Sequence, residues 1–190
     1  MSSQCFFCKQ GAKNLATLSV NPPLTSKVYE DDTCYAILEL EQSAWGYTLV
    51  ILKEHKETIL DENITSEQND GFWKVVRKIG NVIKRKLGAE NVYVCSLCDG
   101  VSHFHVHLIP RYKWTDEHKK RYIELFKDRD GERSVKLATA IGLIGGFWYI
   151  ADTERNFHKT DFMKLPKDEQ LRQLAKLAKE LAEEISKCIH

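Results

Sequence analysis

The chain has 190 residues, enough for one domain or one domain with an extension, and 43% of them are hydrophobic, so it can bury a sizeable core. Its formal net charge of +1 provides no electrostatic surface for nucleic acid or an anionic membrane, so any phosphate must be held by a local site. The start of the chain has no basic and apolar leader, and no apolar window is long enough to span a membrane. We therefore expect a cytoplasmic protein with neither a nucleic-acid nor a membrane partner.

Two cysteines three positions apart, Cys5 and Cys8, come first in the chain. A C-x-x-C pair can place two thiolates on one metal ion, because a tight turn brings both sulfurs round. Two free cysteines would give the same pattern, so the pair alone leaves both interpretations open. A second pair, Cys95 and Cys98, lies near a predicted strand end, where side chains tend to diverge. A four-cysteine zinc site built from both pairs is an alternative.

The next segment predicts antiparallel strands. We expect two short strands between residues 27 and 40, broken at residues 31–32, and a third strand over residues 47–52. Residues 34–38 are apolar throughout, which is typical of a strand covered on both faces. His55 follows the third strand, where a site residue is easily placed. On this stretch alone, an exposed histidine in a charged loop is the simpler interpretation.

A long helix is predicted from Thr65-Ser66 to a C-cap at Gly88. Apolar residues recur along it at helical spacing and basic residues fill the other face, which indicates a helix packed on the core with a solvated outer face. A strand over residues 91–97 follows. We expect it to form a hairpin with the next strand, across a turn at residues 98–100.

The chain changes character after residue 112. We expect a helix over residues 116–127, a strand over residues 147–150 and a final helix that begins near Pro166. The apolar residues of the final helix step by three and four positions and form one stripe: Leu171, Leu174, Ala178, Leu181 and Ile185. This stripe either docks on the domain or pairs with a second copy of the chain, and docking is our preferred interpretation.

Three histidines, His103, His105 and His107, alternate with apolar residues. In a β-strand alternate side chains share a face, so the three imidazoles would line one surface about 6.5–7 Å apart while Phe104 and Val106 point into the core. The alternative is an ordinary half-buried strand whose polar face happens to be histidine. Three in strict alternation, from only seven in the chain, argue against that alternative.

Two kinds of chemistry suit these imidazoles. Ligands of one zinc ion lie only about 3–3.5 Å apart, so three consecutive positions on one strand face cannot all bind one ion without severe convergence. The other arrangement is a division of labour, in which one imidazole attacks and the others bind or orient. His105 is the best-placed nucleophile, since an imidazole on each side can contact phosphate oxygens and Ser102 adds a hydroxyl nearby.

The segment from His103 to Ile109 resembles the signature of the histidine triad (HIT) family, in which three histidines alternate with apolar residues. The pair of strands that precedes the long helix, up to His55, is similar to the same family, and the C-x-x-C start resembles its zinc-containing branch. The resemblance covers roughly residues 4–112. It implies an α+β fold with an antiparallel sheet of about five strands and a long helix between the third and fourth. Residues 1–112 would form the catalytic domain with an N-terminal zinc segment, and residues 113–190 a C-terminal helical extension packed on it.

The resemblance also implies an enzyme that acts on the α-phosphate of a nucleotide. His105 would attack phosphorus to form a transient nucleotidyl-histidine, His107 would bind or protonate phosphate and leaving-group oxygens, and Ser102 would assist the leaving group. Glu39 would contact the ribose hydroxyls. The implied activity is hydrolysis of a dinucleoside polyphosphate or a nucleoside phosphoramidate. A nucleotidyltransferase or phosphorylase, and a nucleotide-binding scaffold without turnover, are the alternatives.

The resemblance further implies a structural zinc ion. The matching ligands are two sulfurs and two nitrogens, which suit a closed tetrahedral site: Cys5, Cys8, His55 and His103. Members of the family are commonly homodimers, so we expect a homodimer unless the extension blocks the interface. The sequence departs from the family pattern at Gln42 and Tyr47, where proline and histidine are usual, in the Leu-Lys-Glu-His stretch that ends at His55, which lacks the usual proline, and in the short turn at residues 98–100. These departures bear on the choice of nucleoside and leaving group.

Overall fold

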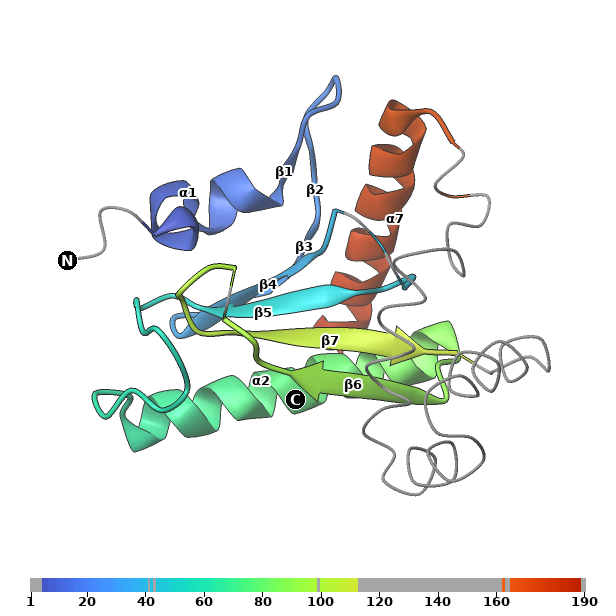
Figure 1. Cartoon of the computed structure of the whole chain (residues 1–190). Helices are drawn as coiled ribbons and strands as arrows, with labels where there is room; N and C mark the ends of the chain where they lie inside the picture. The colour runs from blue at the N-terminus through green and yellow to red at the C-terminus, as the bar shows by residue number, and fades with distance from the viewer. Residues whose placement is uncertain are drawn as a thin grey trace, which may run out of the picture.

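The architecture is a five-stranded antiparallel sheet covered by helices, in a computed structural model that describes residues 5–40, 42, 44–98, 100–112, 162 and 165–188. The strand order is β3-β4-β5-β7-β6 (Figure 1). The strands are β3 (Lys27–Glu30), β4 (Cys34–Leu38), β5 (Thr48–Leu52), β6 (Asn91–Cys95) and β7 (His105–Arg111). The long helix α2 (Ser66–Leu87) connects the third strand of the sheet to the fourth, so the predicted α+β fold is confirmed.

Both faces of the central strands are covered. On one face, α2 and α7 (Lys167–Ser186) pack against a core that includes Phe104, Val106 and Leu108. On the other face, Phe7 and Ala16 of α1 (Phe6–Ala16) join a smaller core with β4 and β5 (Figure 1). All residues of β4 and β5 are buried, which explains why residues 34–38 are apolar without alternation.

The helix α2 has the ends that its sequence predicts. The Thr65 hydroxyl accepts from the Gln68 main-chain N–H, and the Gln68 side chain accepts from the Thr65 N–H, which forms a capping box. Gly88 follows in the left-handed conformation with φ 69°, which suits glycine. The residues at the two ends of α2, as well as its buried face, therefore determine how the chain connects β5 to β6.

The helix α7 places its apolar stripe in the main core. Leu171, Leu174, Ala178, Leu181 and Ile185 are all buried. The helix lies against β3 and α2 (Figure 1), so the stripe docks on the sheet of the same chain. The domain boundary at residue 112 stays a prediction, and the expected helix over residues 116–127 and strand over residues 147–150 lie outside the described residues. No helix within the described ranges has both the length and the apolar character to cross a membrane.

Two elements near the N-terminus were not expected. Helix α1 follows Cys5, and a two-stranded antiparallel sheet pairs β1 (Thr17–Leu18) with β2 (Leu24–Thr25). The helix is interrupted at Gly11, which has φ 62° and ψ 169°, so it consists of two short pieces. Pieces of this length do not produce the long apolar periodicity by which α2 and α7 are recognised.

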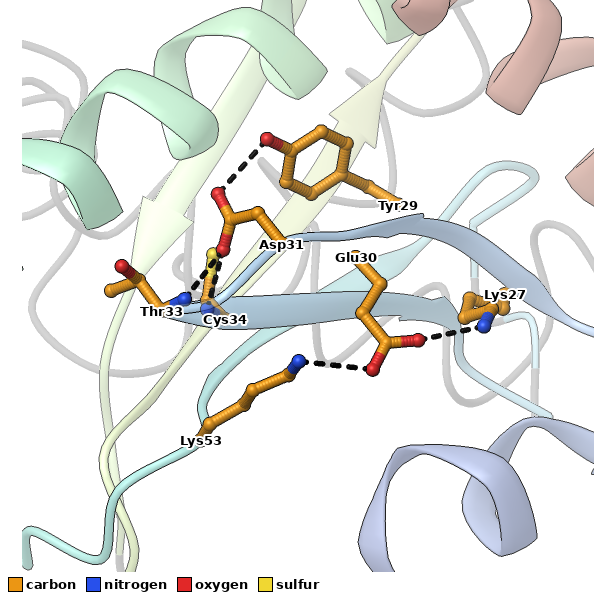
Figure 2. Close-up of polar contacts among 7 residues, drawn as sticks. All are labelled: Lys27, Tyr29, Glu30, Asp31, Thr33, Cys34 and Lys53. Carbon is orange, nitrogen blue, oxygen red and sulfur yellow. Dashed lines mark hydrogen bonds and ion pairs between the residues drawn. The ribbon is translucent and has the colours of Figure 1, made fainter.

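The turn between β3 and β4 is held by side chains, as Figure 2 shows. An Asp31 carboxylate oxygen accepts from the main-chain N–H groups of Thr33 and Cys34 at 2.8 Å each, and its second oxygen accepts from the Tyr29 hydroxyl at 2.9 Å. Burial, and to a lesser extent the hydrogen bond to Asp31, raises the pKa of Tyr29 to about 12. Asp31 thus stabilises the turn at residues 31–32, where the sequence predicted a break between two strands.

Candidate functional site

Four side chains that are far apart in the sequence converge at one end of the sheet: Cys5, Cys8, His55 and His103. Their ligand atoms all lie within 4.8 Å of one another. The Nδ1 atom of His103 is 3.3 Å from the Cys5 sulfur, 3.4 Å from the Cys8 sulfur and 3.3 Å from His55 Nδ1. The Cys8 sulfur is 3.4 Å from His55 Nδ1. The structure therefore brings together all four residues predicted as metal ligands.

One helix positions the two cysteines, and two other segments position the histidines. Cys5 is the N-cap of α1 and Cys8 lies in its first turn, so the spacing of three brings both sulfurs to one side of the helix. His55 lies in the loop after β5, and His103 lies two residues before the start of β7. The Nε2 atom of His103 lies 2.7 Å from the main-chain oxygen of Leu52. If Nε2 donates that hydrogen bond, Nδ1 keeps its lone pair free to bind a metal.

The donor set fits zinc. For bonds of about 2.0–2.1 Å to nitrogen and about 2.3 Å to sulfur, the edges of a tetrahedral zinc site are roughly 3.4–3.8 Å. The measured separations of 3.3–3.4 Å between these atoms are close to that range. Burial lowers the pKa of His103, which keeps the ring in the neutral form that binds metals. A cavity of about 210 Å³ lies beside these four side chains, and Cys8, His103 and Tyr35 are among the residues that line it.

The histidine segment differs from the prediction at its first member. Strand β7 begins at His105, and His103 lies in the bend before it, with its ring in the Cys/His cluster. His105 and His107 are in the strand, and their ring centroids are 4.8 Å apart. Phe104 and Val106, which alternate with the three histidines, are buried in the main core as predicted. One strand face therefore presents two imidazoles, and the third is committed to the neighbouring cluster.

The His105 ring is oriented by the chain itself. Its Nδ1 atom lies 2.6 Å from the main-chain oxygen of His103. A carbonyl oxygen only accepts, so Nδ1 carries the proton and Nε2 has the free lone pair. His105 is 6% exposed, and its ring and that of Phe7 lie nearly perpendicular, at 80°, with centroids 5.1 Å apart. The Ser96 hydroxyl donates to the His105 carbonyl at 2.8 Å, which ties β7 to the end of β6.

The His107 ring has a partner that the sequence did not reveal. Its Nδ1 atom lies 2.6 Å from the Tyr47 hydroxyl. Burial, with a smaller contribution from the nearby His105 charge, lowers the pKa of His107 to about 4, so the ring is neutral at physiological pH. In the antiparallel register Cys95 is the partner of His107 on β6. Neither neighbour could be identified before the strand pairing was known.

The other two predicted site residues lie apart from each other: Glu39 lies beside Tyr47, at the end of the β4–β5 pair opposite the Cys/His cluster, and Ser102 lies in the bend before His103. Glu39 directly follows β4, and its carboxylate accepts from the main-chain N–H of Leu40 at 2.9 Å. Its own N–H donates to the carbonyl of Tyr47, the residue that contacts His107. Ser102 is exposed in the bend before His103. Their roles toward a ligand stay predictions.

Comparison with known proteins identifies the family. The family model described as HIT domain matches residues 23–114. An uncharacterized HIT-like protein of Borreliella burgdorferi is 39% identical over an alignment of 117 residues, and the match covers 57% of this chain and 76% of that protein. The chain belongs to the HIT family. The predicted family is thus confirmed, and with it membership of a superfamily of nucleotide-binding hydrolases and transferases.

Two further HIT relatives extend the comparison. The adenylylsulfatase HINT3 of Arabidopsis thaliana is 28% identical over 131 residues, which cover 64% of this chain and 61% of that protein. The crystal structure of a hypothetical histidine triad nucleotide-binding protein from Sulfolobus tokodaii has a TM-score of 0.56 at 21% identity, over 97% of this chain and 96% of that one. At this identity, the structural likeness concerns the fold alone.

Proposed function

We propose that this HIT protein hydrolyses a nucleotide at its α-phosphate, with His105 as the nucleophile. The observation that carries the proposal is the 2.6 Å contact between His105 Nδ1 and the main-chain oxygen of His103. It leaves Nε2 as the nucleophilic atom and gives the ring a fixed orientation. The same carbonyl oxygen can stabilise the positive charge that the ring acquires when Nε2 bonds to phosphorus.

The reaction takes two displacements. The Nε2 lone pair of His105 attacks phosphorus, and the bond to the leaving group breaks with its electron pair on the departing atom. Water then attacks the nucleotidyl-histidine, the phosphorus–nitrogen bond electrons return to the ring, and a nucleoside monophosphate is released. The neutral His107 donates a hydrogen bond to the leaving-group atom, where negative charge develops. Ser102 assists at the leaving group, and Glu39 binds the ribose hydroxyls.

The substrates we propose are dinucleoside polyphosphates and nucleoside phosphoramidates. The name of the A. thaliana relative, an adenylylsulfatase, supports hydrolysis of an adenylyl group from an acidic leaving group. The same intermediate would serve a nucleotidyltransferase or phosphorylase if phosphate or a sugar phosphate replaced water. A nucleotide-binding scaffold without turnover is the further alternative, but the orientation of His105 favours an enzyme.

We propose that Cys5, Cys8, His55 and His103 hold one structural zinc ion. Two thiolates and two imidazoles at these separations support a closed tetrahedral site without a free position for substrate. The ion would fix α1 to the loop after β5 and to the residue two positions before the nucleophile. Its role in the proposal is to hold His103, and thereby the carbonyl that orients His105.

We also propose that the protein works in the cytoplasm as a homodimer, with nucleotides as its ligands and no nucleic-acid or membrane partner. The near-neutral formal charge supports the absence of a polyanionic partner. Light scattering of the purified protein tests the dimer, and a single-chain mass at all concentrations would contradict it.

The test of the function is turnover of diadenosine polyphosphates and adenosine phosphoramidate by wild type and by His105→Asn. We expect the wild type to release AMP and the variant to lose about a thousandfold or more in kcat, because the nucleophile is missing. The zinc content and melting temperature of the variant serve as the control for folding. Product analysis with and without added phosphate separates hydrolysis from transfer. Equal turnover by both proteins would contradict the proposal.

A further inference from the structure

The contact between Tyr47 and His107 joins two chemically active groups across neighbouring strands. The Tyr47 oxygen and His107 Nδ1 are 2.6 Å apart, and the two rings are inclined at 39° with centroids 5.9 Å apart. Tyr47 directly precedes β5, and the second residue of that strand, Leu49, is the register partner of His107. The sheet register therefore determines which residue meets this imidazole.

The main chain at Tyr47 is held by one buried amide. Gln42 is 2% exposed. Its side-chain nitrogen donates to the carbonyl oxygens of Glu39 at 2.6 Å and Tyr47 at 2.9 Å. Its oxygen accepts from the Gly46 N–H at 2.7 Å. Both donors and the acceptor of the amide are thus used within one loop, which fixes the position of Tyr47.

Gly46 also restrains the main chain at Tyr47. Its φ of 89° is a conformation that side chains rarely adopt, and a Cβ at this position would overlap the Leu87 side chain at the end of α2. The Thr48 hydroxyl donates to the Gly46 carbonyl at 2.9 Å. The residues on both sides of Tyr47 are therefore restrained, and this turn holds the Tyr47 phenol against His107.

A neutral imidazole has one N–H and one lone pair, and the partner of one nitrogen decides which tautomer is present. A phenol hydroxyl that donates to Nδ1 requires the proton to be on Nε2. Resting on the proposed function, we infer that Tyr47, held by Gln42, is a positioning residue that fixes His107 with its proton on Nε2. That N–H is the donor which the leaving-group atom needs. Burial keeps the His107 ring neutral, so the tautomer, not the charge, decides whether a donor is available.

The first test reads the tautomer without any reaction. Long-range nitrogen–proton NMR of the zinc-loaded protein should show His107 with an unprotonated Nδ1 and a protonated Nε2 in the wild type. Tyr47→Phe keeps the ring and removes the hydroxyl, and it should shift the signals toward a mixture of tautomers. Gln42→Ala should shift them in the same direction. Tyr35→Phe is the matched control, since the Tyr35 hydroxyl is buried without a hydrogen-bond partner among the described residues. Identical His107 signals in wild type and Tyr47→Phe would overturn the inference.

The second test compares leaving groups. The probes are the p-nitrophenyl and the unsubstituted phenyl esters of AMP, since the poorer phenoxide needs more help from a hydrogen-bond donor. For Tyr47→Phe we expect a loss of about tenfold in kcat with the phenyl ester, about twofold or less with the p-nitrophenyl ester, and an unchanged KM. Tyr35→Phe should change neither. Equal losses with both esters would indicate a merely structural role and overturn the inference.

The two proposals fail in different ways. If the wild type releases neither phenol and no AMP from diadenosine polyphosphates or adenosine phosphoramidate, the proposed function is wrong, and the nitrogen signals still decide whether Tyr47 fixes the tautomer. If the wild type turns over and Tyr47→Phe is indistinguishable from Tyr35→Phe in both tests, the proposed function stands and the inference about Tyr47 is wrong.

Discussion

The Nε2 atom of His103 lies 2.7 Å from the main-chain oxygen of Leu52, the last residue of β5, while its Nδ1 atom faces two cysteine sulfurs. The carbonyl of the same residue accepts from His105. One residue thus connects the Cys/His cluster, the neighbouring strand and the proposed nucleophile. Loss of the proposed zinc ion should therefore affect the orientation of the His105 ring as well as the anchoring of α1.

The Cys/His cluster leads to a prediction about zinc content. Wild type should contain about one zinc ion per chain, and Cys8→Ser should contain much less, because a hydroxyl is a poor replacement for a thiolate ligand. The free energy of unfolding should fall by about 3 kcal/mol or more, because metal binding and folding are coupled. Elemental analysis and urea unfolding measure both quantities. Cys188→Ser, at an exposed cysteine, is the matched control; equal zinc in the two variants would contradict the site.

The pKa of His107 leads to a prediction about stability and pH. Its folded value of about 4 lies below the ordinary 6.5, so the unfolded chain binds more protons between these values. This contribution to stability is complete above pH 6.5 and is lost as the pH falls toward 4. From pH 7 to pH 5 it should amount to about 1 kcal/mol, allowing for partial solvent screening.

The variant His107→Gln isolates that contribution. Loss of zinc on acidification affects wild type and variant alike, so the difference between their unfolding free energies at pH 7 and pH 5 reports the histidine. Urea unfolding at the two pH values, with zinc content measured in parallel, should give the variant the shallower decline. A wild-type decline no steeper than that of His107→Gln would show that the ring titrates normally.

The buried stripe of α7 leads to a prediction about stability. Leu181 is fully buried in the main core, and Leu181→Ala should lower the free energy of unfolding by about 2–5 kcal/mol. Lys179→Ala, on the exposed side of the same helix, should change it by about 0.5 kcal/mol or less. Chemical denaturation of both variants checks the difference. Similar small effects for the two would mean that the helix does not pack on the sheet.

The elements with long or regular patterns could be predicted from the sequence. The helix α2 was recognised by its apolar spacing, its Thr65 cap and its Gly88 end, and the apolar segment over residues 34–38 indicated a strand covered on both faces. The antiparallel pairing of β6 and β7 followed from their strand patterns, but the connection between them spans residues 96–104 and is longer than the turn expected at residues 98–100. The interrupted helix α1 could not be found in this way, because Gly11 divides it into pieces too short to show a period.

The proposed metal ligands could be named before the fold was known, but the contacts around the histidines could not. The family motif indicated Cys5, Cys8, His55 and His103, and the structure brings them together. Tyr47 was visible only as a departure from the family pattern. Its contact with His107 depends on the register of β5 and β7 and on the Gln42 amide. Such contacts between segments distant in the sequence leave no local pattern.

The central claim is that His105 becomes covalently bonded to a nucleotide. The most direct measurement is rapid acid-free quenching of the wild type during turnover of adenosine phosphoramidate, followed by mass spectrometry of the peptide that contains residues 103–111. We predict the added mass of one adenylyl group, located on His105 by fragmentation and absent from His105→Asn. Turnover without any adenylylated peptide, or an adenylyl group on another residue, would contradict the account.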